Sequence, residues 1–181
     1  GTLIIGEAGR PYPGRGGGAG GDAVQSATFP LSPFSVTGDE KGSGGGGGGG
    51  LVLFLARTIT IGPSGHLRAN GGAGGGGENT LFFDRVGGGS GGGSGGWIVL
   101  EALRIDLTQA SDNAVTALGA VGGPGRNNMP NVAGAGGNGG PGVIQLHTFS
   151  GTEAEILLPP GKQVDDLTSP DGTVLLPILS R

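Results

Sequence analysis

One serine stands in a pattern that could support nucleophilic catalysis. Ser90 lies within Gly88–Gly92, which matches the glycine-x-serine-x-glycine pattern of many hydrolases. That pattern works only where a strand turns sharply into a helix and a histidine reaches the serine. The surrounding run of glycine and serine produces the match by composition alone, so the sequence favours no catalytic serine here.

The residues that could ligate a metal or transfer protons are scattered. His66 and His147 are the only histidines, they stand at different positions of the sequence pattern, and cysteine is absent. The aspartates of 165–171 could hold a cation in a loop, but a solvated turn is favoured. Glu153 and Glu155 fall two apart on a predicted strand, and a solvated strand face is favoured over an acid–base pair. We therefore predict no catalytic residue, no metal and no cofactor, and we predict that the protein is not an enzyme.

Side chains suited to recognition occur in three segments outside the glycine-rich pattern, at residues 10–13, 23–41 and 126–131. Aromatic rings there could stack on sugars or protein surfaces, and amides could bond to hydroxyls. Loops on a rigid scaffold commonly carry function. We predict that a ligand is bound by Tyr12, Phe29, Phe34, Asn127 and Asn128. The alternative for the two phenylalanines is that they cap the core.

The composition excludes two classes of partner. The chain has 181 residues, a net charge of −4 and only 13% charged residues. Its 10 basic residues are spread singly, so no nucleic-acid surface is predicted. The longest apolar run, Leu51–Ala56, is far shorter than the roughly 20 residues that a membrane-spanning helix needs. We predict no binding to nucleic acid and no insertion into a membrane.

The elements that would position these residues follow a repeat of 46 residues. A glycine run precedes an apolar run three times, and the apolar runs begin at Leu51, Trp97 and Val143. Each run is typical of a strand covered on both faces, and the alternation that follows, as in Arg57–Ile61, is typical of a half-exposed strand. A turn and a second short strand come before glycine returns. Periods of about 20 to 50 residues are typical of repeat architectures.

We predict an all-β fold, a repetitive β-solenoid or sandwich of short strand pairs with packed polyglycine-II helices and essentially no α-helix. Equivalent repeat positions should be buried together in rows: Leu51, Leu53, Phe54, Trp97, Val99, Leu100, Val143, Ile144 and Leu146. A single glycine-rich domain, 1–181, would comprise a partial repeat at 1–41, repeats at 42–87, 88–133 and 134–164, and a C-terminal cap or exchanged strand at 165–181. Gly1–Gly6 looks like a second strand without its first, so we expect either that an upstream segment has been removed, which is favoured, or that the chain is an excised piece of a longer protein.

Six glycine tracts separate the strands, at 14–21, 42–50, 71–77, 87–96, 119–125 and 134–142. One interpretation is a set of loops beside an ordinary β-solenoid, since glycine and serine chains are usually flexible. The similar lengths and the register with the strands favour polyproline-II-like helices, which have three residues per turn and would bond to one another through the backbone. Gly47→Val should then be strongly destabilising, and the sparse Ala, Ser, Asn and Pro residues should face outward.

Two stretches resemble a known family. Gly95–Ala102, a glycine run leading into Ile-Val-Leu-Glu-Ala, and Ile59–Gly72 resemble the glycine-rich repeat proteins of bacterial cell surfaces, over roughly residues 42–158. The alternation of glycine tracts and loops is also similar in architecture to the adhesin tips of tailed-phage fibres and to snow-flea antifreeze proteins. The chain departs from the antifreeze pattern by its long apolar strands and its lack of cysteine.

These observations predict a non-catalytic adhesive or recognition module, extracellular or on a cell or virion surface. Its partner would be a cell-surface glycan or protein receptor. The alternative is a structural subunit that assembles into a homo-oligomer or an extracellular fibre, because exposed strands at the ends of a stack can add further chains. Ice binding is a third hypothesis.

Overall fold

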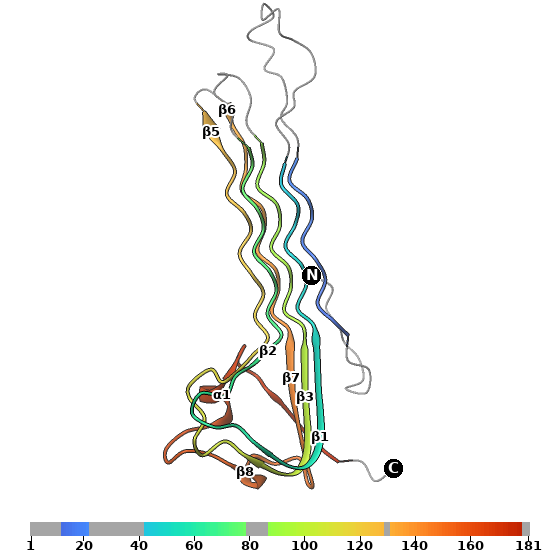
Figure 1. The fold of residues 1–181 in the computed structure, drawn as a ribbon, viewed down its shortest axis with the longest axis vertical. Helices are drawn as coiled ribbons and strands as arrows, with labels where there is room; N and C mark the ends of the chain where they lie inside the picture. Colours follow the sequence, from blue (N-terminus) through green and yellow to red (C-terminus); the bar gives the residue numbers. More distant parts are fainter. Residues whose placement is uncertain (1–11, 22–41, 79–86, 129–130, 179–181) are drawn as a thin grey trace, which may run out of the picture.

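A narrow bundle of glycine tracts stands on a β region in the computed structural model (Figure 1). The structure describes residues 12–21, 42–78, 87–128 and 131–178. Their only helical pieces are a 3₁₀ turn, η1 (Glu153–Glu155), and one helical turn, α1 (Val164–Leu167). The fold class is therefore all-β with almost no helix, as the sequence predicts.

The larger sheet of the β region is parallel throughout. Its strands lie in the order β1 (Leu51–Thr60), β3 (Trp97–Asp106), β7 (Val143–Thr148) and β10 (Val174–Pro177), and β8 (Ile156–Leu157) pairs with the far end of β3. Leu51 lies opposite Trp97, and Trp97 lies opposite Val143. The paired residues are thus separated by the same 46-residue interval that divides the apolar runs in the sequence.

A smaller parallel sheet faces the larger one across the core. It contains β2 (Leu67–Arg68), β4 (Val115–Thr116) and β9 (Thr168–Ser169). The fully buried side chains come from both sheets and from α1, and they include Ile98, Leu100, Ile105, Val115, Leu146 and Leu167. Apolar contacts between the two sheets therefore hold the β region together.

The strand β1 is the edge of the larger sheet, and this position overturns part of the predicted core. Leu51, Leu53 and Phe54 are 44%, 50% and 46% exposed. Sequence equivalence between repeats does not give equal burial, because among the described residues the outermost strand has no paired strand on one side. The prediction is confirmed for Trp97, Val99, Leu100, Ile144 and Leu146, which are buried, whereas Val143 is half-buried.

The other edge of the larger sheet is occupied by β10. This strand belongs to the segment for which the sequence predicts a cap or an exchanged strand. In the structure it pairs with β7 of the same chain, with Leu175 opposite Leu146.

The glycine tracts lie side by side and alternate in direction (Figure 1). We name them tract I (14–21), tract II (42–50), tract III (69–77), tract IV (87–96), tract V (117–126) and tract VI (133–142). Hydrogen bonds between them recur at every third residue: the N–H groups of Gly14, Gly17 and Gly20 donate to the carbonyls of Gly49, Gly46 and Ser43 at 2.6, 2.8 and 2.9 Å. Three residues is the period of the polyproline-II helix. The positive-φ glycines of the described residues all lie outside the tracts.

Tract IV lies at the centre of the bundle. Every N–H group from Gly87 to Trp97 donates to a carbonyl of another segment, and three carbonyls of the tract accept bonds from tract V. Tract IV is bonded in this way to all five other tracts. The N–H groups of tract IV are thus satisfied without a β ladder, as buried backbone groups require.

The same three-residue period decides which glycines have room for a side chain. A Cβ atom at Gly93, in tract IV, would overlap the carbonyl of Gly47, whereas a Cβ atom at Gly47 would meet nothing within 4 Å. The prediction that Gly47→Val destabilises the protein is therefore wrong, because Gly47 belongs to an outward-facing row. Ala73 and Ala135 face outward as predicted, but Ser90 does not, since it is fully buried.

Candidate functional site

Three side-chain-rich segments of the sequence are residues 22–41, 79–86 and 127–132. The described residues beside these segments lie at the end of the bundle farthest from the sheets (Figure 1), where bonds join Gly20 to Ser43, Gly87 to Glu78 at 2.9 Å and Ala133 to Arg126 at 2.8 Å. We call this end the tip. Segments far apart in the sequence leave the bundle there together because the tracts alternate in direction.

Two of the predicted ligand residues lie at the tip in the described part of the chain. Asn127 and Asn128 form β5 (Asn127–Asn128), which pairs antiparallel with β6 (Asn131–Val132). The Nε of Arg126 donates to the Gly77 carbonyl at 2.8 Å and ties this hairpin to tract III. Phe29 and Phe34, also predicted to bind the ligand, lie outside the described residues.

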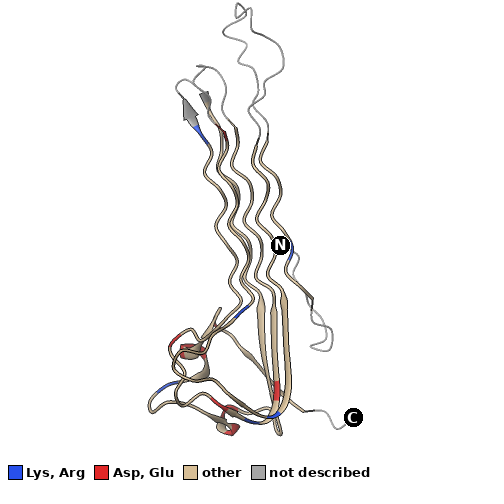
Figure 2. Cartoon of the chain, in the orientation of Figure 1, with Lys and Arg blue, Asp and Glu red and all other residues tan. Residues whose placement is uncertain are grey.

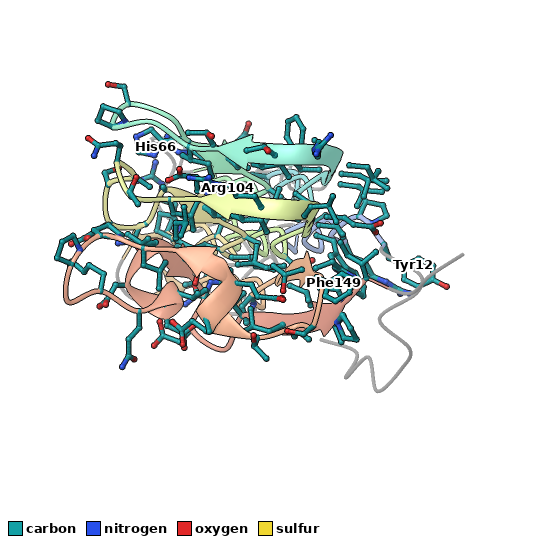
Figure 3. The ribbon with its side chains drawn as sticks, turned by 90° about the horizontal axis from the view of Figure 1, so that it is seen from below. Tyr12, His66, Arg104 and Phe149 are labelled. Carbon is teal, nitrogen blue, oxygen red and sulfur yellow. The ribbon has the colours of Figure 1, made fainter. Side chains whose placement is uncertain are left out.

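Tyr12 lies at the opposite end of the bundle from the tip. It precedes Gly14, whose N–H bonds to Gly49 beside the start of β1, and it is 52% exposed. Figure 3, viewed from the sheet end, shows Tyr12 at the margin of the molecule, away from His66. The tract between the two ends is about 28 Å long if nine residues rise by about 3.1 Å each. The structure therefore does not bring Tyr12 together with the predicted asparagines.

Tyr12 instead lines a groove between tracts I and VI. The groove has a volume of about 990 Å³, and tract IV forms part of its lining. Trp97 and Val143, the first residues of two strands, lie at its sheet end. Trp97 is only 5% exposed, and its indole Nε1 has no hydrogen-bond partner among the described residues. The sequence does not reveal this groove, because its walls are mostly glycine backbone and carry few side chains.

Ser90, the residue of the hydrolase-like pattern, lies inside the bundle. Its Oγ is 2.7 Å from the Gly44 carbonyl oxygen and 3.1 Å from that of Gly75, and the hydroxyl of Ser43 lies 3.2 Å away. Ser90 has an exposed fraction of 0%. The hydroxyl thus links tract IV to tracts II and III, and it is withdrawn from solvent.

Charged side chains of the described residues are concentrated in the β region, and few lie along the bundle (Figure 2). Hydrogen bonds from the Thr108 hydroxyl at 2.7 Å and the Thr108 N–H at 3.1 Å hold the pKa of Asp106 below its ordinary value, with a smaller effect from Arg104. An ion pair with Asp112 at 3.0 Å raises the pKa of Lys162. Both interactions lie at the surface of the β region, where the Asp106 side chain is partly buried and that of Asp112 is exposed.

The other acidic residues stabilise turns. Glu153 and Glu155 lie in η1 and not on a strand as the sequence predicts, and their carboxylates accept the N–H groups of Val164 and Ser150, each at 2.8 Å. Asp165 accepts N–H groups of the following turn. Within the described ranges, no group of three or more His, Asp or Glu residues is placed to hold a metal ion.

The geometry described above is the main evidence on the function of this chain, because comparisons with known proteins add none. No family model, curated protein or solved structure matches the chain. The described residues include no helix long and apolar enough to cross a membrane.

Proposed function

We propose that this chain is a non-catalytic adhesive or recognition module of a cell or virion surface, and that its tip binds a cell-surface glycan or protein receptor. The observation that carries the proposal is that the described residues beside 22–41, 79–86 and 127–132 all lie at one end of a long bundle. Most of the bundle is glycine and offers few side chains for contact, so contacts with a ligand would come from these segments.

We further infer that the tracts are polyglycine-II helices and that tracts and strands together form a repeating unit. The three-residue interval of the hydrogen bonds supports the first inference. The 46-residue offset between paired strands supports the second. A bundle of this kind would hold the tip at a fixed distance from the sheets, as a recognition loop on a rigid scaffold requires.

The tip segments contain side chains suited to recognition. Residues 22–41 include Phe29 and Phe34, and residues 79–86 include Phe82 and Phe83, a pair that the sequence-based prediction left out. With the asparagines of 127–132, these residues offer aromatic surface and amide groups, which suit sugars and protein surfaces.

The test compares aromatic residues at the two ends of the molecule. Phe29→Ala and Phe34→Ala should abolish binding to intact cells, and their signal on a glycan array, while the melting temperature stays unchanged. Phe149→Ala is the matched control, because Phe149 is 75% exposed and follows β7 at the sheet end. Wild-type binding by both tip variants, or equal loss in the control, would overturn the proposal.

The exposed edge of β1 favours a second function, a structural subunit of a self-assembling fibre. Unpaired strand edges can add further chains, and charged or short edges normally prevent this. This edge is ten residues long and exposes leucines 51, 53 and 55. Sedimentation separates the two functions: discrete species support recognition at the tip, and filaments of variable length support a fibre.

A further inference from the structure

The tracts around tract IV form a ring that is open on one side. Successive neighbours in the ring are bonded to each other: tract I to II, II to III, III to V, and V to VI. No hydrogen bond joins tract VI back to tract I among the described residues. Side-by-side packing of such helices gives a central helix room for six neighbours, and tract IV has five. The groove between tracts I and VI lies at the sixth position.

The floor of this groove carries a row of free acceptors. Gly92 and Gly95 line the groove, and their carbonyls accept no hydrogen bond from the described residues. Gly89, one turn farther along, continues the row. The other carbonyl rows of tract IV are directed to tracts II and V. One row of carbonyls on the central tract, spaced three residues apart, therefore has no partner in the part of the chain that the structure describes.

The two walls of the groove carry free donors. In tract VI, the N–H groups of Gly137 and Gly140 donate to no described residue, and Gly140 lines the groove. In tract I the same holds for the N–H of Gly18, while the N–H of Arg15 in the same row donates to the Ser94 hydroxyl at 2.7 Å. A Cβ atom at Gly18, Gly137 or Gly140 would meet nothing within 4 Å, so these rows border open space.

The sheet end of the groove is lined by bulky side chains, those of Tyr12, Pro13 and Trp97. Trp97 is more than nine-tenths buried, and its Nε1 has no hydrogen-bond partner among the described residues. Aromatic side chains line the kind of groove in which polyproline-II segments dock.

We propose that the groove binds one strand of another chain in the polyproline-II conformation, with glycine at every third position. The N–H groups of those glycines would donate to the carbonyls of Gly89, Gly92 and Gly95. The strand's carbonyls would accept from the N–H groups on the walls of the groove. This surface is distinct from the tip, and the proposal does not rest on the proposed function.

The contact rows within the bundle explain why the bound strand needs glycine. A Cβ atom at Gly92 would overlap the Ala120 carbonyl of tract V, and one at Gly95 would overlap that of Ala117. At these two donors a side chain would therefore overlap a neighbouring backbone, although Ser90 and Ser94 show that other donors of the same tract have room for a small side chain. The remaining two positions of each turn lack this restriction and can be proline, which pre-sets the φ angle of the polyproline-II conformation.

The first experiment uses a matched pair of peptides. One is four repeats of Gly-Pro-Pro, in which only glycine has an N–H group, kept monomeric as checked by sedimentation. The other replaces each glycine by N-methylglycine, which removes those donors. Calorimetric titration of the full chain should show binding of the first peptide and at least about tenfold weaker binding of the second, since about three hydrogen bonds are lost. Equal affinity, or no binding of either peptide, would overturn the proposal.

The second experiment changes the groove wall. The variant Gly137→Pro with Gly140→Pro removes two donors that are unused in the free protein, so its melting temperature should not fall. Its affinity for the Gly-Pro-Pro peptide should drop by about tenfold or more. Ala135→Pro is the matched control: its N–H is also unused, but it belongs to a different row of tract VI, and binding should stay at the wild-type level.

Two further outcomes are decisive. Equal binding by the groove variant and the control would overturn the proposal. A second result would also overturn it: the wild type sediments as a dimer, the groove variant sediments as a monomer, and the peptide does not bind. The occupant of the groove would then be a second copy of this chain. The tip variants Phe29→Ala and Phe34→Ala should bind the peptide normally, so this test is independent of cell adhesion.

Discussion

The glycine bundle and the β region solve the same packing problem by opposite means. In the β region, side chains such as Leu100 and Leu146 fill the space between two sheets and are fully buried. In the bundle the neighbouring tracts come so close that most inward positions have no room for a Cβ atom. The β region is specified by side chains that are present, and the bundle is specified by side chains that are absent.

The two regions therefore differ in what a substitution can do. In the β region, truncation leaves a cavity, and its cost depends on burial. In the bundle, a methyl group added to a glycine of an inward row forces two backbones apart. The same methyl group on a glycine of an outward row should leave the free energy of unfolding almost unchanged. The predictions that follow test this difference, from the largest expected effect to the smallest.

The largest effect is expected at the centre of the bundle. Gly93→Ala places a Cβ atom on the Gly47 carbonyl, so tracts II and IV cannot keep their separation. We expect a loss of about 4 kcal/mol or more in the free energy of unfolding, the range of the severest single substitutions. Chemical denaturation followed by circular dichroism measures this loss.

The control for Gly93→Ala is the glycine on the other side of the same contact. Gly47→Ala adds a methyl group where nothing lies within 4 Å, and its effect should stay within about 0.5 kcal/mol. Equal unfolding midpoints for the two variants would show that the tracts do not pack in this register.

The next effect concerns two residues that face each other across neighbouring strands. Leu100 pairs with Phe54, yet Leu100 is fully buried and Phe54 is 46% exposed. Leu100→Ala should cost about 2–5 kcal/mol, and Phe54→Ala clearly less, because the loss grows with the cavity left behind. Thermal unfolding of both variants measures the difference. A larger loss for Phe54→Ala would mean that the edge of β1 is covered in solution.

The smallest effect is a dependence on pH that belongs to the β region alone. Hydrogen bonds from Thr108 lower the pKa of the Asp106 carboxyl in the folded protein. Stabilisation by this group is therefore present above its unfolded pKa, near 3.8, and is lost as the pH falls through the lower folded value. The melting temperature of Asp106→Asn should lie slightly below that of the wild type at pH 7, and the two should converge in acid. A difference that grows on acidification would contradict this assignment.

The sequence predicted the strands better than it predicted their surroundings. The spacing of Leu51, Trp97 and Val143 anticipated which residues lie opposite one another, because parallel strands repeat the same side-chain pattern. Burial was mispredicted at Leu53 and Phe54, since a sequence repeat contains no information about which copy lies at an edge. In the tracts, Gly47 and Gly93 are identical in sequence terms, and only the three-dimensional neighbours distinguish an open position from a closed one.

The candidate sites show the same limit. If neighbouring tracts are antiparallel, every second connection between tracts falls at the same end of the bundle. The sequence therefore allows the prediction that 22–41, 79–86 and 127–132 begin and end there. The same alternation places Tyr12 at the other end, because it precedes the first tract, and the prediction that grouped Tyr12 with Phe29, Phe34 and the asparagines did not apply it. The groove was invisible in the sequence, since backbone carbonyls of glycine leave no trace in residue identity.

The bonds between tracts run across the long axis of the bundle, and this orientation governs its mechanical behaviour. A force applied between the tip and the sheets acts along the tracts and loads these bonds in shear. In tract IV, all the N–H groups from Gly87 to Gly96 would resist together, because a tract cannot slide without breaking every bond in its rows at once. A force directed across the axis would instead open the bonds one after another, from an end. The protein should thus resist extension far better than peeling.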